Sequence, residues 1–265
     1  MLHLLKKFLK VCIVIFKIDW VDTLRINLCH LPLRKGIKFP ILLYHAQLKI
    51  AQSANVEINI PAEKCIFGMI KMGCAYANNV ISSIGIKINL GENSRLVFAG
   101  SAVIGNGSSI EARQNGNIYI GRNFGNTGTL TICSDCEISI GDNVSCSWDV
   151  SIFDTDMHDY VDGQTGLPLS SKHPIELGDF SWICQKCIIL KGASLPAWSV
   201  LGAYSLLCKD YLRSVPPYEK YTVFVGNPAK PTSKRIKRTD LDKISKSSAW
   251  IITSSFRIIN RIPSL

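Results

Sequence analysis

The chain has 265 residues, of which 47% are hydrophobic, and a formal net charge of +10, which predicts one elongated domain with terminal additions. The charge is concentrated at the ends, because residues 1–50 and 230–265 each hold nine Lys or Arg against two Asp, and the residues between them are net acidic. This distribution argues against nucleic-acid binding, which would favour a basic face on the folded domain, and for contacts of the basic ends with an anionic membrane surface.

Residues 1–60 are expected to form a basic and apolar N-terminal segment. One helical face gathers apolar residues, with lysines near its edges: Leu4, Leu5, Phe8, Leu9, Cys12, Ile15 and Phe16, and Lys6, Lys7, Lys10 and Lys17. Uninterrupted apolar sequence runs only over residues 11–16, far short of the ~20 residues that a membrane-spanning helix needs. The segment is therefore expected either to lie on a membrane surface or to cap the open end of the following domain.

The cellular compartment is predicted from the early lysines and from the cysteines. The lysines interrupt the only early apolar stretch, and no small-residue cleavage site follows, so no signal peptide is expected. Several of the ten cysteines stand where the repeat described next places small apolar residues, which indicates free thiols rather than a disulfide framework. The expected location is the cytoplasm, and the basic ends are expected to allow peripheral contact with the inner face of the membrane.

Residues 61–235 are predicted to form a parallel β-helix, because a period of six runs through them. Five consecutive hexads begin with Leu or Ile, at Leu177, Ile183, Ile189, Leu195 and Leu201, and the fifth position is always small: Ser181, Cys187, Ala193, Ser199 and Ser205. Neither a helix of period 3.6 nor an alternating strand gives this pattern, whereas stacked coils of short strands do. Upstream the period continues less regularly, with Gly and Asn where a corner would need positive φ. Residues 154–174 interrupt it as a loop, and a β-sandwich would show stronger alternation.

The last segment, residues 236–265, is expected to be a basic helical extension. It contains a short amphipathic stretch between Leu241 and Ile262, with apolar residues around Trp250 and Phe256. Such a segment can pack back on the coil, contact a membrane or bind a partner.

Five runs of the repeat carry a more specific signal: 177–183, 188–192, 199–203, 208–210 and 225–230. They resemble the hexapeptide-repeat acyltransferases, above all the sugar O-acetyltransferases of the galactoside and maltose type and their relatives in capsule and lipopolysaccharide assembly. The resemblance covers roughly residues 85–235. It implies a left-handed parallel β-helix, a homotrimer, and acetyl-coenzyme A bound in clefts between neighbouring coils.

Acetyl transfer from a thioester to a sugar hydroxyl requires a base for the hydroxyl proton, and histidine has a suitable pKa. Three of the five histidines precede the repeat, which leaves His158 and His173 in the interrupting loop. His158 ends the run 154–158, which resembles the Asp-Thr-Asp-x-His segment of the family, in which the histidine is the general base. Asp154 or Asp156 is expected to orient its imidazole, and the sequence does not decide which. His173 is expected to be a solvated loop residue.

Four residues are candidates for coenzyme A binding. By resemblance, Trp182 lies beside the pantetheine arm, and the backbone of Ala203 contacts it. Lys209 and Lys230 match basic residues that approach the phosphates, a role that suits a cation. Alternatives stay open, because Trp182 can equally pack a corner or a subunit seam, and exposed lysines are common. Two positions depart from the family pattern. The family usually has Thr where this chain has Cys208, directly before Lys209, and Gly where this chain has Cys184.

Two residues are candidates for acceptor binding. Thr127 stands where galactoside acetyltransferases place an asparagine that contacts the sugar, so the acceptor is left open. Trp148 can stack on a sugar face or simply occupy a corner. The expected acceptor is a sugar or glycan intermediate.

Competing functions remain. N-acylation of an amino sugar or nucleotide sugar needs the same base and fold, and a non-catalytic hexapeptide scaffold needs neither His158 nor the lysines. No metal is expected, although Cys133/Cys136 and Cys184/Cys187 have Cys-x-x-Cys spacing. A β-helical zinc hydratase would need three histidines, and the loop supplies two.

Overall fold

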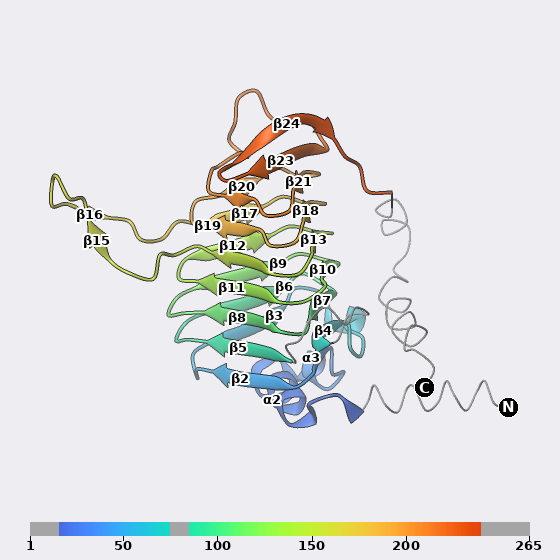
Figure 1. Ribbon diagram of the computed structural model, residues 1–265. Coiled ribbons are helices and arrows are strands. Elements are labelled where there is room, and N and C mark those ends of the chain that lie inside the picture. The colour runs from blue at the N-terminus through green and yellow to red at the C-terminus, as the bar shows by residue number, and fades with distance from the viewer. Residues whose placement is uncertain (1–15, 75–84, 240–265) are drawn as a thin grey trace.

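Three parallel sheets wrap around one axis and form a three-sided prism (Figure 1). The computed structural model describes residues 16–74 and 85–239. Each turn of the chain adds one strand to each sheet in succession, so residues about twenty apart lie side by side on neighbouring coils. The predicted parallel β-helix is therefore confirmed.

The first two sheets hold most of the strands. The nine-stranded sheet has the order β1 (Ile41–Leu43), β4 (Ile70–Cys74), β7 (Ala102–Gly105), β10 (Phe124–Asn126), β13 (Ser145–Cys146), β18 (Trp182–Ile183), β21 (Val200–Leu201), β23 (Thr222–Gly226) and β24 (Ala229–Arg235). The seven-stranded sheet has the order β2 (Ala46–Ile50), β5 (Ile86–Leu90), β8 (Ser108–Ala112), β11 (Leu130–Ser134), β14 (Val150–Phe153), β19 (Ile188–Leu190) and β22 (Leu206–Leu207). All their pairs are parallel except β23–β24, which closes one end of the coil.

The third sheet and the additions complete the chain. The six-stranded sheet has the order β20 (Ser194–Leu195), β17 (Ile175–Leu177), β12 (Glu137–Ile140), β9 (Asn117–Ile120), β6 (Arg95–Phe98) and β3 (Asn55–Ile58). The additions are the helices α2 (Trp20–His30) and α3 (Leu33–Gly36), the 3₁₀ turn η1 (Ala62–Lys64), and an antiparallel hairpin of β15 (Tyr160–Val161) and β16 (Pro168–Leu169). The hairpin projects sideways from the prism, within the predicted loop 154–174 (Figure 1).

The hexad rule describes the core. The five aliphatic residues at position one are at most 1% exposed, and the five small residues at position five at most 2%. The aliphatic side chains of successive coils therefore stack inside the prism, while the small residues fit the corners where the chain bends. Stacking is what buries this surface, since a single coil has no second layer to cover it.

The residue types at corners with positive φ differ between the first and the second half of the coil. In one column of corners, Asn123 and Asn143 both have φ 58°, and the Asn123 amide donates to the Asn143 side-chain oxygen at 3.1 Å. Further along the same column the residues are Phe180, Trp198 and Tyr221, also with positive φ. The rings of Phe180 and Trp198 stack with centroids 4.0 Å apart. The sequence associated such corners with Gly and Asn alone, and aromatic stacking offsets the backbone strain at the others.

The N-terminal end of the prism is closed by α2. Its inner residues bind the free edge of β1: Thr23 Oγ1 accepts from the Leu43 N–H at 3.1 Å, and Asn27 exchanges hydrogen bonds with both backbone groups of Ile41. A free strand edge is thereby satisfied. Parallel pairing already begins at Ile41, upstream of the expected boundary at residue 61. The boundary was expected later in the chain because the first coils lack regular hexads.

Two predicted segments lie outside the described residues. The helical face expected over Leu4–Ile15 precedes them, and the amphipathic stretch between Leu241 and Ile262 follows them. Across residues 16–74 and 85–239, no helix combines the length and the apolar character needed to cross a membrane.

Asp210 stabilises the last turn of the coil, and the free energy of unfolding should therefore decrease at acid pH. Burial raises the pKa of its carboxyl, but hydrogen bonds from Ser194 and Arg213 outweigh burial and lower the pKa to about 2. A lowered carboxyl pKa stabilises the fold above the unfolded value of about 4, and this contribution is lost as the pH falls towards 2. Because Asp210 is largely exposed, we expect only about 1 kcal/mol. Urea unfolding at pH 5 and pH 2.5 should show a smaller decline for Asp210→Asn than for the wild type; equal declines would contradict this assignment.

Candidate active site

The candidate residues are best described by the edges of the prism. The first edge joins the nine- and seven-stranded sheets and includes residues 127–129, 147–149, 184–187 and 202–205. The second edge joins the seven- and six-stranded sheets and includes residues 135–136, 154–174, 191–193 and 208–210. Along each edge, successive corners stack at the strand spacing of about 4.8 Å.

The loop that carries His158 is rooted at the second edge by Asp154. This carboxylate is fully buried and accepts hydrogen bonds from Ser134 Oγ at 2.7 Å, the Asp135 N–H at 2.7 Å and the Cys136 N–H at 3.0 Å. Burial raises the pKa of Asp154, and the hydrogen bonds to the carboxylate oppose that effect. Asp154 therefore fastens the loop to the preceding coil rather than to the imidazole.

Asp156 fastens the loop to the following coil. Its carboxylate lies 2.6 Å from Lys191 Nζ and accepts from Tyr160 Oη at 2.6 Å. These hydrogen bonds, first that of Lys191 and then that of Tyr160, lower the pKa of the Asp156 carboxyl. Lys191 Nζ also donates to the carbonyl of Ser170 at 2.8 Å, so the lysine holds both arms of the hairpin.

His158 stands between these anchors and the hairpin. The Met157 N–H donates to Thr155 Oγ1 at 3.0 Å, which forms a tight turn directly before the histidine. The His158 residue is exposed, and both candidate orienting carboxylates are engaged with other groups. The histidine is thus an exposed residue on a loop whose root is fixed.

His173 lies where the loop returns to the coil. Its N–H donates to the Asp154 carbonyl at 3.0 Å and its carbonyl accepts from Gly192 at 3.2 Å. Its backbone closes the loop root, while its side chain is exposed, as the sequence predicts.

Three of the candidate residues lie on the first edge. Thr127 and Trp148 stand at successive corners, and Ala203 follows two coils later in an exposed turn. Among the described residues, the buried Thr127 Oγ1 has no hydrogen-bond partner, so this hydroxyl is enclosed rather than offered to solvent. Trp148 is half-buried. Trp182 lies nearby on the outer face of β18, with the Arg238 guanidinium 5.6 Å from its ring.

The two candidate lysines lie elsewhere. Lys209 is exposed on the second edge, where its carbonyl accepts from the Ser194 N–H at 3.0 Å. Lys230 is exposed on β24 at the end of the coil, opposite Val225. Lys209 therefore shares an edge with His158, whereas Ala203 does not.

Residue 148 stands at the first edge and residue 154 at the second, so one side of the prism separates the two edges. Six extended residues span up to roughly 20 Å, which is the width of that side. Within one chain the candidates thus lie on two edges and, for Lys230, at the end of the coil, and the structure does not bring them into a single cleft.

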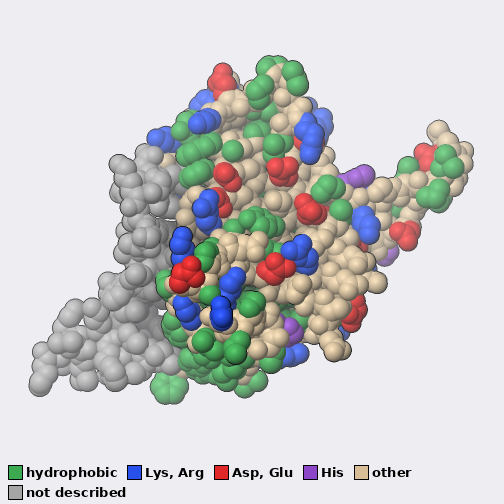
Figure 2. Space-filling model, turned by 180° about the vertical axis from the view of Figure 1, so that it is seen from behind, with side chains coloured by type: hydrophobic (Ala, Val, Ile, Leu, Met, Phe, Trp, Pro, Cys, Tyr) green, Lys and Arg blue, Asp and Glu red, His purple; other side chains and the backbone are tan. Residues whose placement is uncertain are grey.

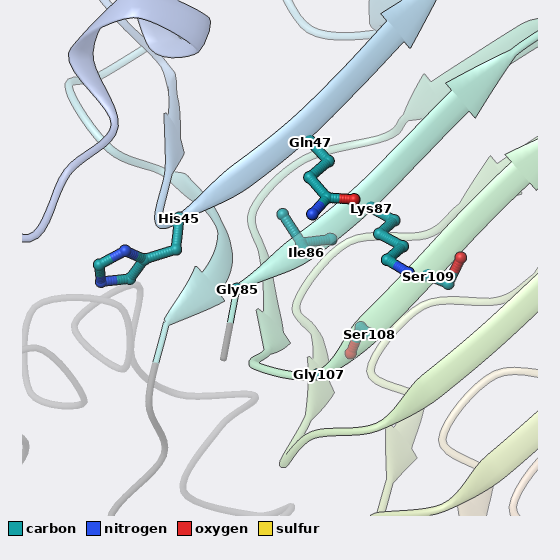
Figure 3. Close-up of a pocket in the computed structure, with 8 residues that line it drawn as sticks. All are labelled: His45, Gln47, Gly85, Ile86, Lys87, Gly107, Ser108 and Ser109. Atoms are coloured by element: carbon teal, nitrogen blue, oxygen red, sulfur yellow. The ribbon is translucent and has the colours of Figure 1, made fainter. Parts of the chain in front are cut away.

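A separate pocket opens on the first edge near α2 (Figure 3). It has a volume of about 320 Å³ and is lined by His45, Gln47, Gly85, Ile86, Lys87, Gly107, Ser108 and Ser109. Figure 3 shows Gln47, Lys87 and Ser109 side by side on neighbouring strands, with His45 pointing away from them. The pocket contains none of the candidate site residues predicted from the sequence.

The cysteines of the two Cys-x-x-Cys pairs are held as neutral thiols by burial. Burial raises the pKa of all four thiols, to about 12 for Cys133 and to about 11 for Cys187, and so disfavours the thiolate. Within the described parts of the chain, no group of three or more His, Cys, Asp or Glu side chains is arranged to hold a metal ion.

Sequence reasoning missed the residues that position the loop. Ser134, Tyr160 and Lys191 hold it in place, yet none stands at a fixed distance from His158 in the sequence. The loop itself breaks the period of six, so the pairing of Asp156 with Lys191 could not be read from the repeat. The one available signal was that Lys191 follows the β19 strand at the corner equivalent to Asp154.

The chain is 35% identical over 101 residues to the galactoside O-acetyltransferase of Escherichia coli, covering 38% of this chain and 47% of that protein. It is 32% identical over 120 residues to a Schizosaccharomyces pombe protein that carries an acetyltransferase name, covering 44% and 53%. The chain thus spans about half the length of these curated relatives. No family model matches. Among solved structures, the polySia-specific acetyltransferase NeuO aligns with a TM-score of 0.47 and 18% identity over 78% of this chain and 100% of that one.

Proposed function

Because its β-helix is homologous to the hexapeptide-repeat acetyltransferases, we propose that this chain transfers an acetyl group from acetyl-coenzyme A to a hydroxyl of a sugar or glycan intermediate. The observation that carries the proposal is the loop at the second edge. It holds an exposed histidine on a root pinned by Asp154 and Asp156, in a chain that is 35% identical to a galactoside O-acetyltransferase over 101 residues. A scaffold has no need of a histidine held in this way.

In the proposed reaction, His158 takes the proton of the acceptor hydroxyl as its oxygen attacks the thioester carbonyl. The new C–O bond forms, the C–S bond breaks, and the proton passes from the imidazolium to the leaving sulfur of coenzyme A. No enzyme nucleophile is needed, since the thioester is already activated. Asp154 and Asp156 act as positioning residues, because they hold the loop and not the ring.

The proposed coenzyme site uses Trp182 and Ala203 for the pantetheine arm and Lys209 and Lys230 for the phosphates. Trp148 is the proposed acceptor contact, and Thr127, whose hydroxyl is enclosed in its own chain, stands at the preceding corner of the same edge. Since Trp148 and Ala203 lie on the first edge while His158 and Lys209 lie on the second, we place each site between the first edge of one chain and the second edge of another in a homotrimer. A cleft between chains would also exclude water from the thioester.

We place this reaction in the cytoplasm. The nine cysteines that the structure describes are all free thiols, as a reducing compartment requires.

N-acylation of an amino sugar is the alternative, because the same base and donor would serve an amine. The deciding experiment measures release of free coenzyme A from acetyl-coenzyme A with a panel of sugars, amino sugars and nucleotide sugars. Turnover with a hydroxyl acceptor supports the proposal, and turnover with amines alone supports the alternative. Absence of both turnover and coenzyme A binding would support the non-catalytic scaffold instead.

Replacing Lys209 and Lys230 with Ala should raise the KM for acetyl-coenzyme A and leave the KM for the acceptor nearly unchanged. A charge-assisted contact to phosphate is worth about 1 to 3 kcal/mol, so each loss should raise KM by roughly five- to 150-fold. Steady-state kinetics of both variants test this expectation. Lys49→Ala, an exposed lysine on β2 far along the coil, is the matched control. Equal affinity of all variants for coenzyme A and its 3′-dephospho form would contradict a role at the 3′-phosphate.

A further inference from the structure

The end of the prism closed by α2 presents an apolar face to solvent. Val21, Leu24 and Leu28 are 77%, 43% and 43% exposed and lie on one side of the helix, since they are three and four residues apart. The opposite side, with Thr23 and Asn27, is buried on the coil. α2 therefore does not end the apolar core with a polar surface, as a cap for a soluble coil would.

α3 extends this face. Gly36 packs directly on α2, because a Cβ at this position would lie 2.1 Å from the Asn27 carbonyl oxygen. Beside this contact, Leu33 is 67% exposed and Ile37 is 57% exposed. We call Val21, Leu24, Leu28, Leu33 and Ile37 the cap face. Figure 2 shows hydrophobic side chains gathered at this end of the molecule, with Lys and Arg side chains next to them.

Residues 20–38, which carry the cap face, hold four Lys or Arg against one acidic residue, Asp22, and three of the cations bind the edges of the coil. Arg25 Nη1 donates to the Leu48 carbonyl of β2 at 3.3 Å, and Lys35 Nζ donates to the Ile58 carbonyl of β3 at 2.6 Å. Lys38 Nζ donates to the Ala62 carbonyl at 2.7 Å, while Arg34 is exposed. The side chains thus reach outward from the helices to the first strands of two sheets. An apolar centre with a basic rim results.

Single exposed apolar residues are ordinary, but five on two packed helices mark an interaction surface. The basic rim favours a binding partner that is negatively charged. An anionic lipid bilayer offers an apolar interior for the centre and phosphates for the rim at the same time, and each Lys or Arg near such a surface adds attraction. We infer that the cap face docks this protein on anionic membranes, with α2 and α3 in the plane of the interface and the coil standing away from it.

The test uses the full chain with lipid vesicles, either pure phosphatidylcholine or two-thirds phosphatidylcholine and one-third phosphatidylglycerol. Wild type should float with the anionic vesicles, and high salt should weaken binding without abolishing it, because the apolar part is not screened. Leu24→Asp with Leu28→Asp should lower the partition coefficient at least about tenfold. Val215→Asp, at a residue 96% exposed near the opposite end, should leave it unchanged. Thermal melts should show each variant still folded, because Leu24 and Leu28 are partly exposed and their substitution leaves the buried side of α2, with Thr23 and Asn27, intact.

Other outcomes would overturn the inference. Vesicle binding that survives the double substitution but disappears when residues 1–15 are deleted would assign the membrane contact to that segment. A change in oligomeric state on double substitution, measured by sedimentation without lipid, would make the cap face an interface between copies. Failure of wild type to float would exclude membrane docking. None of these readouts depends on acetyl transfer, so the inference can fail while the proposed function stands.

Discussion

Replacing His158 with Ala is expected to lower the rate of acetyl transfer by about 10²- to 10⁴-fold, the usual cost of losing a general base. Coenzyme A binding and thermal stability should stay close to those of the wild type. The reason is structural, because the residue is exposed and the loop root is held by Asp154 and Asp156 and not by the imidazole. Single-turnover rates with a saturating acceptor, together with a coenzyme A binding isotherm, measure the two effects separately.

The matched control is His173→Ala, which removes the other histidine of the same loop. Its backbone bonds to Asp154 and Gly192 would remain, so the variant should keep most of the activity. If His173→Ala abolished transfer and His158→Ala did not, the base would be His173. Loss of activity in both variants with a lowered melting temperature would indicate that the loop, and not one imidazole, had been damaged.

The repeat region of the fold could be predicted from the sequence because its rule is local. A coil needs an aliphatic residue inside each strand and a small one at each bend, and both follow from the position within six residues, as Leu177 and Ser181 illustrate. The first coils also bury aliphatic residues, but they follow the period of six less regularly. There the edge of β1 is satisfied by Thr23 and Asn27 of a helix, and contacts between different kinds of element leave no period in the sequence.

The candidate site was harder to predict than the coil. Resemblance indicated His158, and one of the two neighbouring carboxylates, Asp154 or Asp156, was expected to orient its imidazole. In the structure, Asp154 serves backbone groups of the preceding coil and Asp156 serves Lys191 of the following one. These partners are brought together only by stacking across the loop insertion. A sequence motif can therefore indicate which residue types belong to a site without showing what each contacts.

Separation of the candidates onto two edges predicts that hybrid oligomers recover activity. Ala203→Trp should abolish transfer by filling the proposed pantetheine cleft on the first edge, and the exposed turn can take the larger side chain without disturbing the core. His158→Ala removes the base from the second edge. If each site uses one edge from each of two neighbouring chains, a hybrid contains sites in which one chain supplies an intact His158 and the other an intact Ala203.

Co-expression of the two variants in equal amounts, with one shared tag so that every trimer is recovered, should therefore restore about a quarter of the wild-type activity, since both edges are intact at one site in four of a randomly mixed population of rings. The control mixes wild type with the double variant. Sites between chains again give about a quarter, whereas sites within one chain would give about a half, and the mixture of single variants would then stay inactive. The ratio of the two mixtures separates the arrangements even if absolute yields vary. Equal recovery would place the base and the coenzyme edge on different chains, while an inactive single-variant mixture would require His158 to reach the first edge of its own chain.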